Sequence, residues 1–273
     1  MILDQLIDFY WYHIRNLKRH ERKLIKYQGF GDRSIIKFKR ESGLGWKTIS
    51  KILDSIKILD GLELRNHIRA IYNSNKELFD DPNTYVTHFG PIGKSGAFIV
   101  NQFLRCFPGK GRMIIANSNS ELSKLPADSS IIFLDDFIGT GKQGLDYVRQ
   151  VSPSLNSSIK PYLFTICGTQ EGIELINGFG SNFKISAQVI LSKEKDHLLD
   201  PSNEILEDKE KQMIKNLNNL IGIENKNKYH LGLPFAFYYS APDNSLGILW
   251  SDNNKYKIND IERKWYGLIP REY

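Results

Sequence analysis

Two adjacent carboxylates, Asp135 and Asp136, lead directly into a glycine-rich turn in this chain of 273 residues. Four apolar residues precede the acids, and residues 139–143 read Gly-Thr-Gly-Lys-Gln. The N–H groups of a glycine turn that opens a helix attract phosphate, and carboxylates beside such a turn are suited to sugar hydroxyls or magnesium. The residue types therefore indicate a site for a phosphorylated sugar or a nucleotide.

The elements on either side of the acids predict where this site lies in the fold. The apolar run at residues 131–134 is typical of a parallel strand that is covered on both faces, and a helical pattern begins at Gly144. The acids and the turn are thus expected at the carboxyl end of a strand, which is the edge of an open α/β sheet where ligands bind. The alternative is a plain buried strand that ends in a solvated turn.

A second glycine-rich loop, at residues 90–96, reads Gly-Pro-Ile-Gly-Lys-Ser-Gly. It follows a predicted strand at 84–89 and precedes a predicted helix at 97–107. Further strands are predicted at 111–117, 162–167 and 185–191, with a helix at 170–176. This alternation predicts a parallel α/β sheet with crossover helices.

The two acids and the Gly-Thr-Gly turn resemble the binding motif of type I phosphoribosyltransferases. In that family the acids hold the ribose hydroxyls of phosphoribosyl pyrophosphate, and the loop amides hold its 5′-phosphate. The resemblance implies a type I phosphoribosyltransferase fold in which Asp135 and Asp136 are catalytic and bind Mg²⁺ together with the ligand. The implied ribose 5′-phosphate loop consists of Gly139, Thr140, Gly141, Lys142 and Gln143.

The same resemblance makes the earlier loop the pyrophosphate-binding loop. Its lysine would neutralise charge on the leaving group, so it counts among the implied catalytic residues. The loop consists of Gly90, Gly93, Lys94, Ser95 and Gly96.

Whether the chain is an enzyme stays open at this point. Lys142-Gln143 stands where the family usually has a small hydroxyl residue, and the interval at 118–130, where the family places a mobile lid, is short. Both departures favour a catalytically inactive nucleotide sensor, whereas the retained acids favour a phosphoribosyltransferase. A P-loop-like NTPase is a further alternative, because Gly93-Lys94-Ser95 resembles the end of a P-loop, although His88 stands where that motif requires glycine.

A basic arm precedes the predicted sheet. Twelve basic and three acidic residues lie between positions 15 and 51, so the rest of the chain is mildly acidic although the formal net charge is +6. Residues 35–53 resemble a helix–turn–helix with Gly43 at the turn, which would place Trp46, Lys47, Thr48, Ser50 and Lys51 on an outward face. Lys47, Thr48 and Lys51 are therefore candidate nucleic-acid contacts. Such contacts would make the chain a nucleic-acid-binding regulator, which is a further alternative to an enzyme. The alternative for the arm itself is a solvated helical cap on the core.

The end of the chain carries a second resemblance. Strand-like runs at 233–250 surround a Pro-Asp-Asn turn and predict a strand pair that completes the sheet. The run at 240–250, with Trp265 and Pro270-Arg271, is similar to phosphoribosyltransferase-like proteins of bacterial conflict systems. This resemblance covers residues 80–273 and implies an effector or accessory component of antiviral defence, with a partner protein in that system.

The sequence also predicts a division into two parts and a location. Residues 1–79 are expected to form the basic helical region, and 80–273 the α/β domain. No apolar segment is long enough to span a membrane, and Asp4 and Asp8 interrupt the only leader-like stretch. The two cysteines are expected to be reduced core thiols, so a cytoplasmic protein is expected. The six histidines lack metal-ligand spacing, so no metal site made of protein side chains alone is expected.

Overall fold

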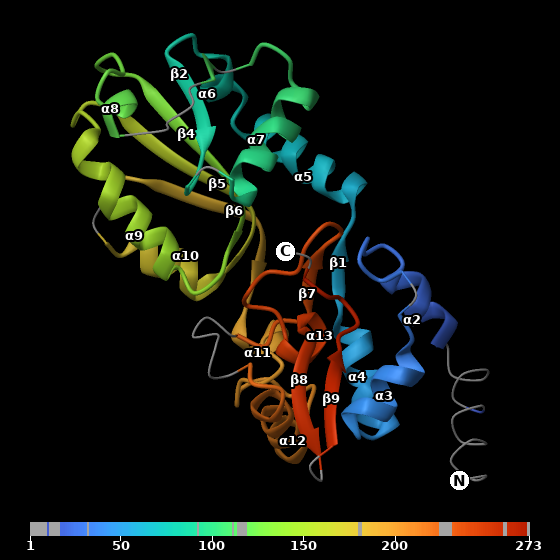
Figure 1. Ribbon diagram of the computed structural model, residues 1–273. Helices are drawn as coiled ribbons and strands as arrows, with labels where there is room; N and C mark the ends of the chain where they lie inside the picture. Colours follow the sequence, from blue (N-terminus) through green and yellow to red (C-terminus); the bar gives the residue numbers. More distant parts are fainter. Residues whose placement is uncertain are drawn as a thin grey trace. The chain divides into compact units, whose positions relative to one another are not determined.

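The computed structural model describes residues 10, 17–31, 33–91, 93–110, 112–113, 119–179, 182–223, 231–258 and 261–271 (Figure 1). The chain forms two compact units. One unit combines Met1–Asp60 with Lys193–Tyr273, and the other is the continuous segment Gly61–Ser192. The expected boundary between residues 79 and 80 lies inside the second unit, so the structure groups the chain differently from the sequence-based division.

The continuous unit is built on a five-stranded parallel sheet in the order β3-β2-β4-β5-β6. Along β4, Phe133 is paired with Thr87 of β2 and with Leu163 of β5. This sheet confirms the predicted parallel α/β fold. Its strands are β2 (Thr84–His88), β3 (Arg112–Met113), β4 (Ser130–Ile138), β5 (Lys160–Thr169) and β6 (Lys184–Leu191).

Helices cover both faces of this sheet (Figure 1). On one face Phe79 and Phe103 stack with ring centroids 4.8 Å apart, and Phe79 lies 6.1 Å from Phe164 of β5. On the other face Val148 and Ile176 pack with the strand residues of a separate buried cluster. The first face carries α5 (Gly61–Ser74), α6 (Lys76–Asp80) and α7 (Ser95–Cys106), and the second carries α8 (Asn119–Leu122), α9 (Lys142–Val151), the short 3₁₀ helix η1 (Ser152–Ser154) and α10 (Gln170–Asn177).

The predicted strands are present, but several elements differ in extent from the prediction. The acids lie inside β4 and not beyond it, because the ladder to β5 continues through Asp135 to Ile138. Helix α9 begins at Lys142, two residues earlier than expected. Of the strand predicted at 111–117, β3 covers Arg112–Met113, and residues 114–117 lie outside the described part of the chain.

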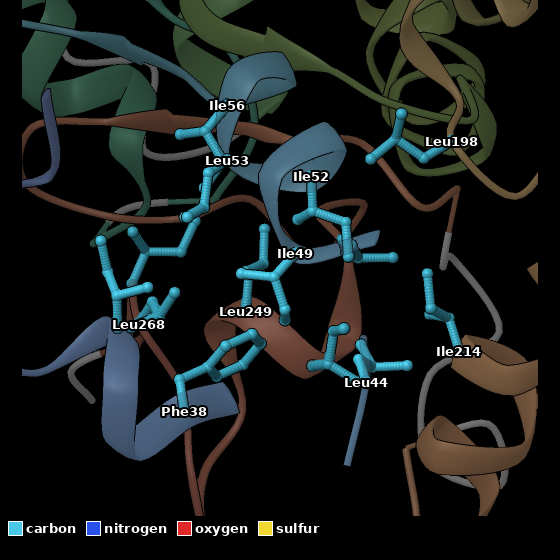
Figure 2. Close-up of a cluster of buried hydrophobic side chains, with 14 of the residues drawn as sticks. Phe38, Leu44, Ile49, Ile52, Leu53, Ile56, Leu198, Ile214, Leu249 and Leu268 are labelled. Atoms are coloured by element: carbon cyan, nitrogen blue, oxygen red, sulfur yellow. The ribbon is translucent and has the colours of Figure 1, made fainter. Parts of the chain in front are cut away.

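The other unit joins residues of its two chain segments in one hydrophobic core. Figure 2 shows Phe38, Ile49 and Leu249, from three different elements, in a single buried cluster. Its first segment contains α2 (Leu17–Leu24), α3 (Ile35–Ser42), α4 (Trp46–Ser55) and β1 (Lys57–Leu59). Its second segment contains α11 (Lys193–Asp196), α12 (Asp208–Leu220), β7 (Phe235–Phe237), α13 (Gly247–Trp250), β8 (Asp252–Ile258) and β9 (Ile261–Tyr266).

Helices α3 and α4 form the predicted pair joined at Gly43. Gly43 adopts the left-handed conformation with φ 65°, and its N–H donates to the carbonyl of Lys39, which ends α3. The expected outward face of α4 is partly wrong, because Trp46 and Thr48 are 8% and 6% exposed. Both residues are buried since α4 packs on two sides: its apolar stripe faces the core, and its first turn faces α12.

The C-terminal segment also differs from the prediction. Phe235–Phe237 pairs in parallel with β1 and does not extend the five-stranded sheet, whereas the antiparallel pair of this region is β8–β9. The run predicted as a second strand forms α13, and Leu246, Ile248 and Leu249 are all fully buried there. A short apolar run of this kind suits a buried helical turn as well as a strand, and periodicity cannot separate the two.

Candidate functional site

The paired acids lie near the carboxyl end of β4, the third strand of the five-stranded sheet. Asp136 is buried, and its Oδ1 accepts a hydrogen bond of 2.7 Å from the hydroxyl of Ser95, the first residue of α7. Asp135 is half-buried, and its Oδ1 accepts from the backbone N–H of Asp136 at 3.0 Å. The two carboxylates are thus held in place by short, specific bonds to their neighbours.

Burial raises the pKa of Asp135 well above its usual value, and the adjacent Asp136 carboxylate raises it further. The hydrogen bond from the Asp136 N–H opposes this shift and is the weaker effect. Burial, and then the charge of Asp135, also raise the pKa of Tyr147 on α9. Two acids placed so close in a buried site favour binding of a cation or of several hydroxyl donors.

The Gly-Thr-Gly turn joins β4 to α9, as predicted. Gly141 has φ 77° and precedes Lys142, the first residue of α9, and its carbonyl accepts from Leu145 N–H at 2.8 Å. No side chain caps the start of α9, and its first turn contains no acidic residue. Because the first N–H groups of a helix lack intrahelical partners, this turn presents donors and a positive dipole end to an anion.

The second glycine loop joins β2 to α7 at the same edge of the sheet. Gly90 and Gly93 have φ of 82° and 85°, and Lys94 is exposed at the start of α7. Gly96 lies against the sheet backbone, since a Cβ there would be 2.6 Å from the carbonyl oxygen of Phe89. Absence of a side chain at this position therefore lets α7 begin directly over the strand end.

The two loops and the acids converge because β2 and β4 are adjacent parallel strands. Phe89 N–H donates to the Leu134 carbonyl at 2.9 Å, so the ladder continues up to the first loop. The Ser95–Asp136 hydrogen bond then links the start of α7 to the acid pair. The structure thus brings together the sequence-predicted residues of both loops and the two acids, while Ile92 lies outside the described residues.

The candidate nucleic-acid residues lie in the other unit and have acidic partners within the chain. The hydroxyl of Thr48 donates to Glu210 at 2.7 Å, and Lys51 Nζ lies 2.5 Å from the same carboxylate. Lys47 Nζ lies 2.8 Å from Glu207. Both glutamates belong to the capping box at the start of α12, so the first turn of this helix faces the basic side chains of α4.

Glu210→Ala is expected to destabilise this unit by about 2 kcal/mol, because Glu210 is 8% exposed and accepts bonds from Thr48, Lys51 and Glu207 N–H. Chemical denaturation would measure the change. Lys47→Ala is the control, since the Lys47–Glu207 pair is exposed on both sides. Equal stability of both variants would contradict a structural role for the buried carboxylate.

Two residues that contact the Gly-Thr-Gly turn were not predicted from the sequence. Thr169 ends β5 and donates its hydroxyl to the carbonyl of Gly139 at 2.6 Å. Gly172, in the first turn of α10, lies against the same turn backbone. A threonine before a helical pattern signals a helix cap, but nothing in its spacing reveals a partner 30 residues away in the sequence.

Comparison with known families identifies the chain. Residues 33–271 match the family model described as PRTase-CE, the phosphoribosyltransferases of conflict systems. The chain belongs to the PRTase-CE family. The match confirms the resemblance drawn from the acid motif and the C-terminal run, and it also takes in residues 33–79, beyond the span expected from the sequence.

Solved phosphoribosyltransferases resemble part of this PRTase-CE chain at low identity. Adenine phosphoribosyltransferase of Leishmania tarentolae is 9% identical with a TM-score of 0.36, over 48% of this chain and 72% of that chain. Adenine phosphoribosyltransferase of Trypanosoma brucei, solved with AMP, pyrophosphate and ribose-5-phosphate, is 14% identical with a TM-score of 0.34, over 56% and 77%. No curated protein sequence matches the chain.

The described part of the chain contains no helix that is long and apolar enough to cross a membrane. It also contains no group of three or more His, Cys, Asp or Glu side chains arranged to hold a metal ion. Neither Cys106 nor Cys167 forms a disulfide, and Cys167 is buried in β5.

Proposed function

We propose that this PRTase-CE protein binds phosphoribosyl pyrophosphate, or a related nucleotide, together with Mg²⁺ at the edge formed by β2 and β4. The hydrogen bond from Ser95 to Asp136 carries the proposal, because it joins the first turn of α7 to the acid pair. A pyrophosphate loop and a ribose-binding carboxylate must be adjacent if one ligand is to touch both. The proposed biological role is that of an effector or accessory component of antiviral defence, acting with a partner protein.

Each element of the site has a distinct role in this proposal. Asp135 and Asp136 accept hydrogen bonds from the ribose hydroxyls, and charge-assisted bonds of this kind are the stronger ones in proteins. The N–H groups at the start of α9, in the turn at residues 139–143, hold the 5′-phosphate. Lys94 and the glycine amides of the loop at residues 90–96 face the pyrophosphate, where positive charge stabilises a leaving group.

The donor set fits magnesium that is bound jointly by protein and ligand. Mg²⁺ prefers hard oxygen ligands, keeps several waters, and is commonly held by one or two carboxylates plus substrate phosphates. Asp135 and Asp136 supply such oxygens, and no third acidic or histidine ligand accompanies them within the described residues. When bound, the ion would supply charge neutralisation at the pyrophosphate.

Isothermal titration calorimetry with phosphoribosyl pyrophosphate and Mg²⁺ tests this proposal. We expect saturable binding of phosphoribosyl pyrophosphate, and weaker binding when Mg²⁺ is left out. ATP titrated in place of phosphoribosyl pyrophosphate should bind more weakly. A pyrophosphate-release assay on the same protein then separates a transferase from a non-enzymatic sensor, since both would bind the ligand. Hydrolysis of ATP without binding of the activated sugar would instead favour the P-loop-like NTPase alternative.

Lys94→Ala is expected to weaken binding of phosphoribosyl pyrophosphate about 10-fold while leaving binding of ribose 5-phosphate nearly unchanged. The reason is that an exposed lysine beside the pyrophosphate loop serves the group that ribose 5-phosphate lacks. Calorimetry with both ligands measures the difference. Lys160→Ala is the matched control, because Lys160 is also exposed but lies at the amino end of β5, whereas both loops lie at the carboxyl ends of the strands.

A further inference from the structure

The hydroxyl of Thr169 connects the Gly-Thr-Gly turn at residues 139–143, the phosphate turn, to α10. Thr169 is fully buried at the end of β5 and forms the N-cap of α10. Its Oγ1 donates to the carbonyl of Gly139 at 2.6 Å and accepts from the N–H of Gly172 at 3.0 Å. One hydroxyl thereby satisfies the cap of α10 and a carbonyl of the turn at the same time.

The turn and α10 also meet backbone to backbone. A Cβ added to Gly172 would lie 2.0 Å from the carbonyl oxygen of Gly139, and one added to Gly141 would lie 2.5 Å from the carbonyl oxygen of Gly172. Only glycine at both positions permits this approach. The turn therefore rests on the first turn of α10 and is not an isolated surface loop.

Fixing the Gly139 carbonyl fixes the next amide as well. The peptide unit is planar, and the described chain contains no cis peptide bond, so the N–H of Thr140 points opposite to the carbonyl of Gly139. Thr169 holds that carbonyl toward β5 and α10. The Thr140 N–H is consequently directed away from α10.

We propose that Thr169 is a positioning residue for the phosphate turn: its hydroxyl holds the Gly139–Thr140 peptide so that the Thr140 N–H is available to a phosphate. This inference rests on the proposed ligand site and assigns to it a residue from the neighbouring strand. Thr169 does not touch the ligand. It acts by keeping a donor oriented before the ligand arrives, which lowers the entropic cost of binding.

Thr169→Val tests the proposal, because valine keeps the shape of the side chain and removes the hydroxyl. Calorimetry with ribose 5-phosphate is expected to show about 10-fold weaker binding, and Thr169→Ser is expected to restore it to within about 2-fold. Should the valine variant fail to fold, Thr169→Ala replaces it in the same comparison. Equal affinity of wild-type, valine and serine proteins, all folded, would overturn the positioning role.

Amide hydrogen exchange without ligand provides a readout that is independent of binding. Thr169→Val should speed exchange of the Leu145 N–H, which donates to the Gly141 carbonyl of the turn, about 10-fold, whereas Thr169→Ser should not. Ser245→Ala is the matched control, since Ser245 also donates a buried 2.6 Å bond to a carbonyl, that of Phe235. Failure of the wild-type protein to bind phosphorylated sugars would overturn the proposed function. Unchanged exchange in the valine variant would overturn the positioning role of Thr169.

Discussion

Replacing Asp135 and Asp136 together by asparagine is expected to weaken binding of phosphoribosyl pyrophosphate by about 100-fold or more. Each carboxylate would accept charge-assisted hydrogen bonds worth roughly 1.5–3 kcal/mol, and both charges support the bound Mg²⁺. Asparagine keeps an oxygen in each position, so the bonds from Ser95 and from the Asp136 N–H are retained. The loss should therefore appear in affinity and not in the fold.

The stability of the same variant gives a second, opposite signal. Burial and the neighbouring carboxylate raise the pKa of Asp135 above its unfolded value, so the native state binds the proton more tightly than the unfolded chain. Ionisation then costs native stability, and this cost grows as pH rises from about 4 through the raised pKa. Asparagine carries no such cost. Thermal melting at pH 7 is expected to show a melting temperature equal to or above that of the wild type.

Asp146→Asn serves as the control for this pair, because Asp146 is 76% exposed on α9 and lies outside the strand end. It should change neither affinity nor melting temperature measurably. A folded double variant that binds as tightly as the wild type would remove the acids from the site and with them the main support for the proposed function.

Gly172→Ala is expected to produce the second large effect, a combined loss of stability and of phosphate affinity. The new methyl group would meet the carbonyl oxygen of Gly139 at 2.0 Å, and neither can rotate away, because the backbone fixes the position of a Cβ and the oxygen is itself a backbone atom. Overpacking of this kind typically costs 1–3 kcal/mol, and relief of the clash must shift the turn at residues 139–141. We expect at least about 10-fold weaker binding of ribose 5-phosphate.

Calorimetry and chemical denaturation measure these two changes on the same protein. Gly45→Ala provides the comparison, because a Cβ at Gly45 meets no atom within 4 Å and its φ is −67°. That variant should bind normally and lose roughly 0.5–1 kcal/mol, because alanine is a poorer N-cap than glycine at the start of α4. Normal binding by a folded Gly172→Ala protein would show that the turn does not depend on its contact with α10.

The strands that carry the site could be predicted from the sequence because their signals are local. The run at residues 131–134 is apolar on both faces, which is typical of a covered parallel strand, and the two acids follow it directly. The glycines of both loops mark the strand-to-helix turns that the structure contains. Local pattern and tertiary structure agree here, so the location of the candidate site at the carboxyl ends of β2 and β4 could be predicted from the sequence.

The partners of the site residues could not be predicted, because they depend on contacts between distant segments. Thr169 reaches Gly139 only after β5 has paired with β4, and Thr48 reaches Glu210 across 162 residues of sequence. The charge of the basic arm suggested a polyanion, yet Lys47 and Lys51 lie against glutamates of α12. Charge patterns report sign and density, whereas the identity of the opposing charge is set by tertiary packing.

The pairing of β1 with β7 sets an order on the formation of the protein during synthesis. Lys57 is paired with Phe235, so this two-stranded ladder and the core around it need residues made long after the first helices leave the ribosome. The segment Gly61–Ser192 has its own sheet and core and is synthesised in between. It can therefore fold first, while α2, α3 and α4 wait with their apolar faces uncovered. Their apolar faces thus stay exposed on the nascent chain until β7 and α13 have been made.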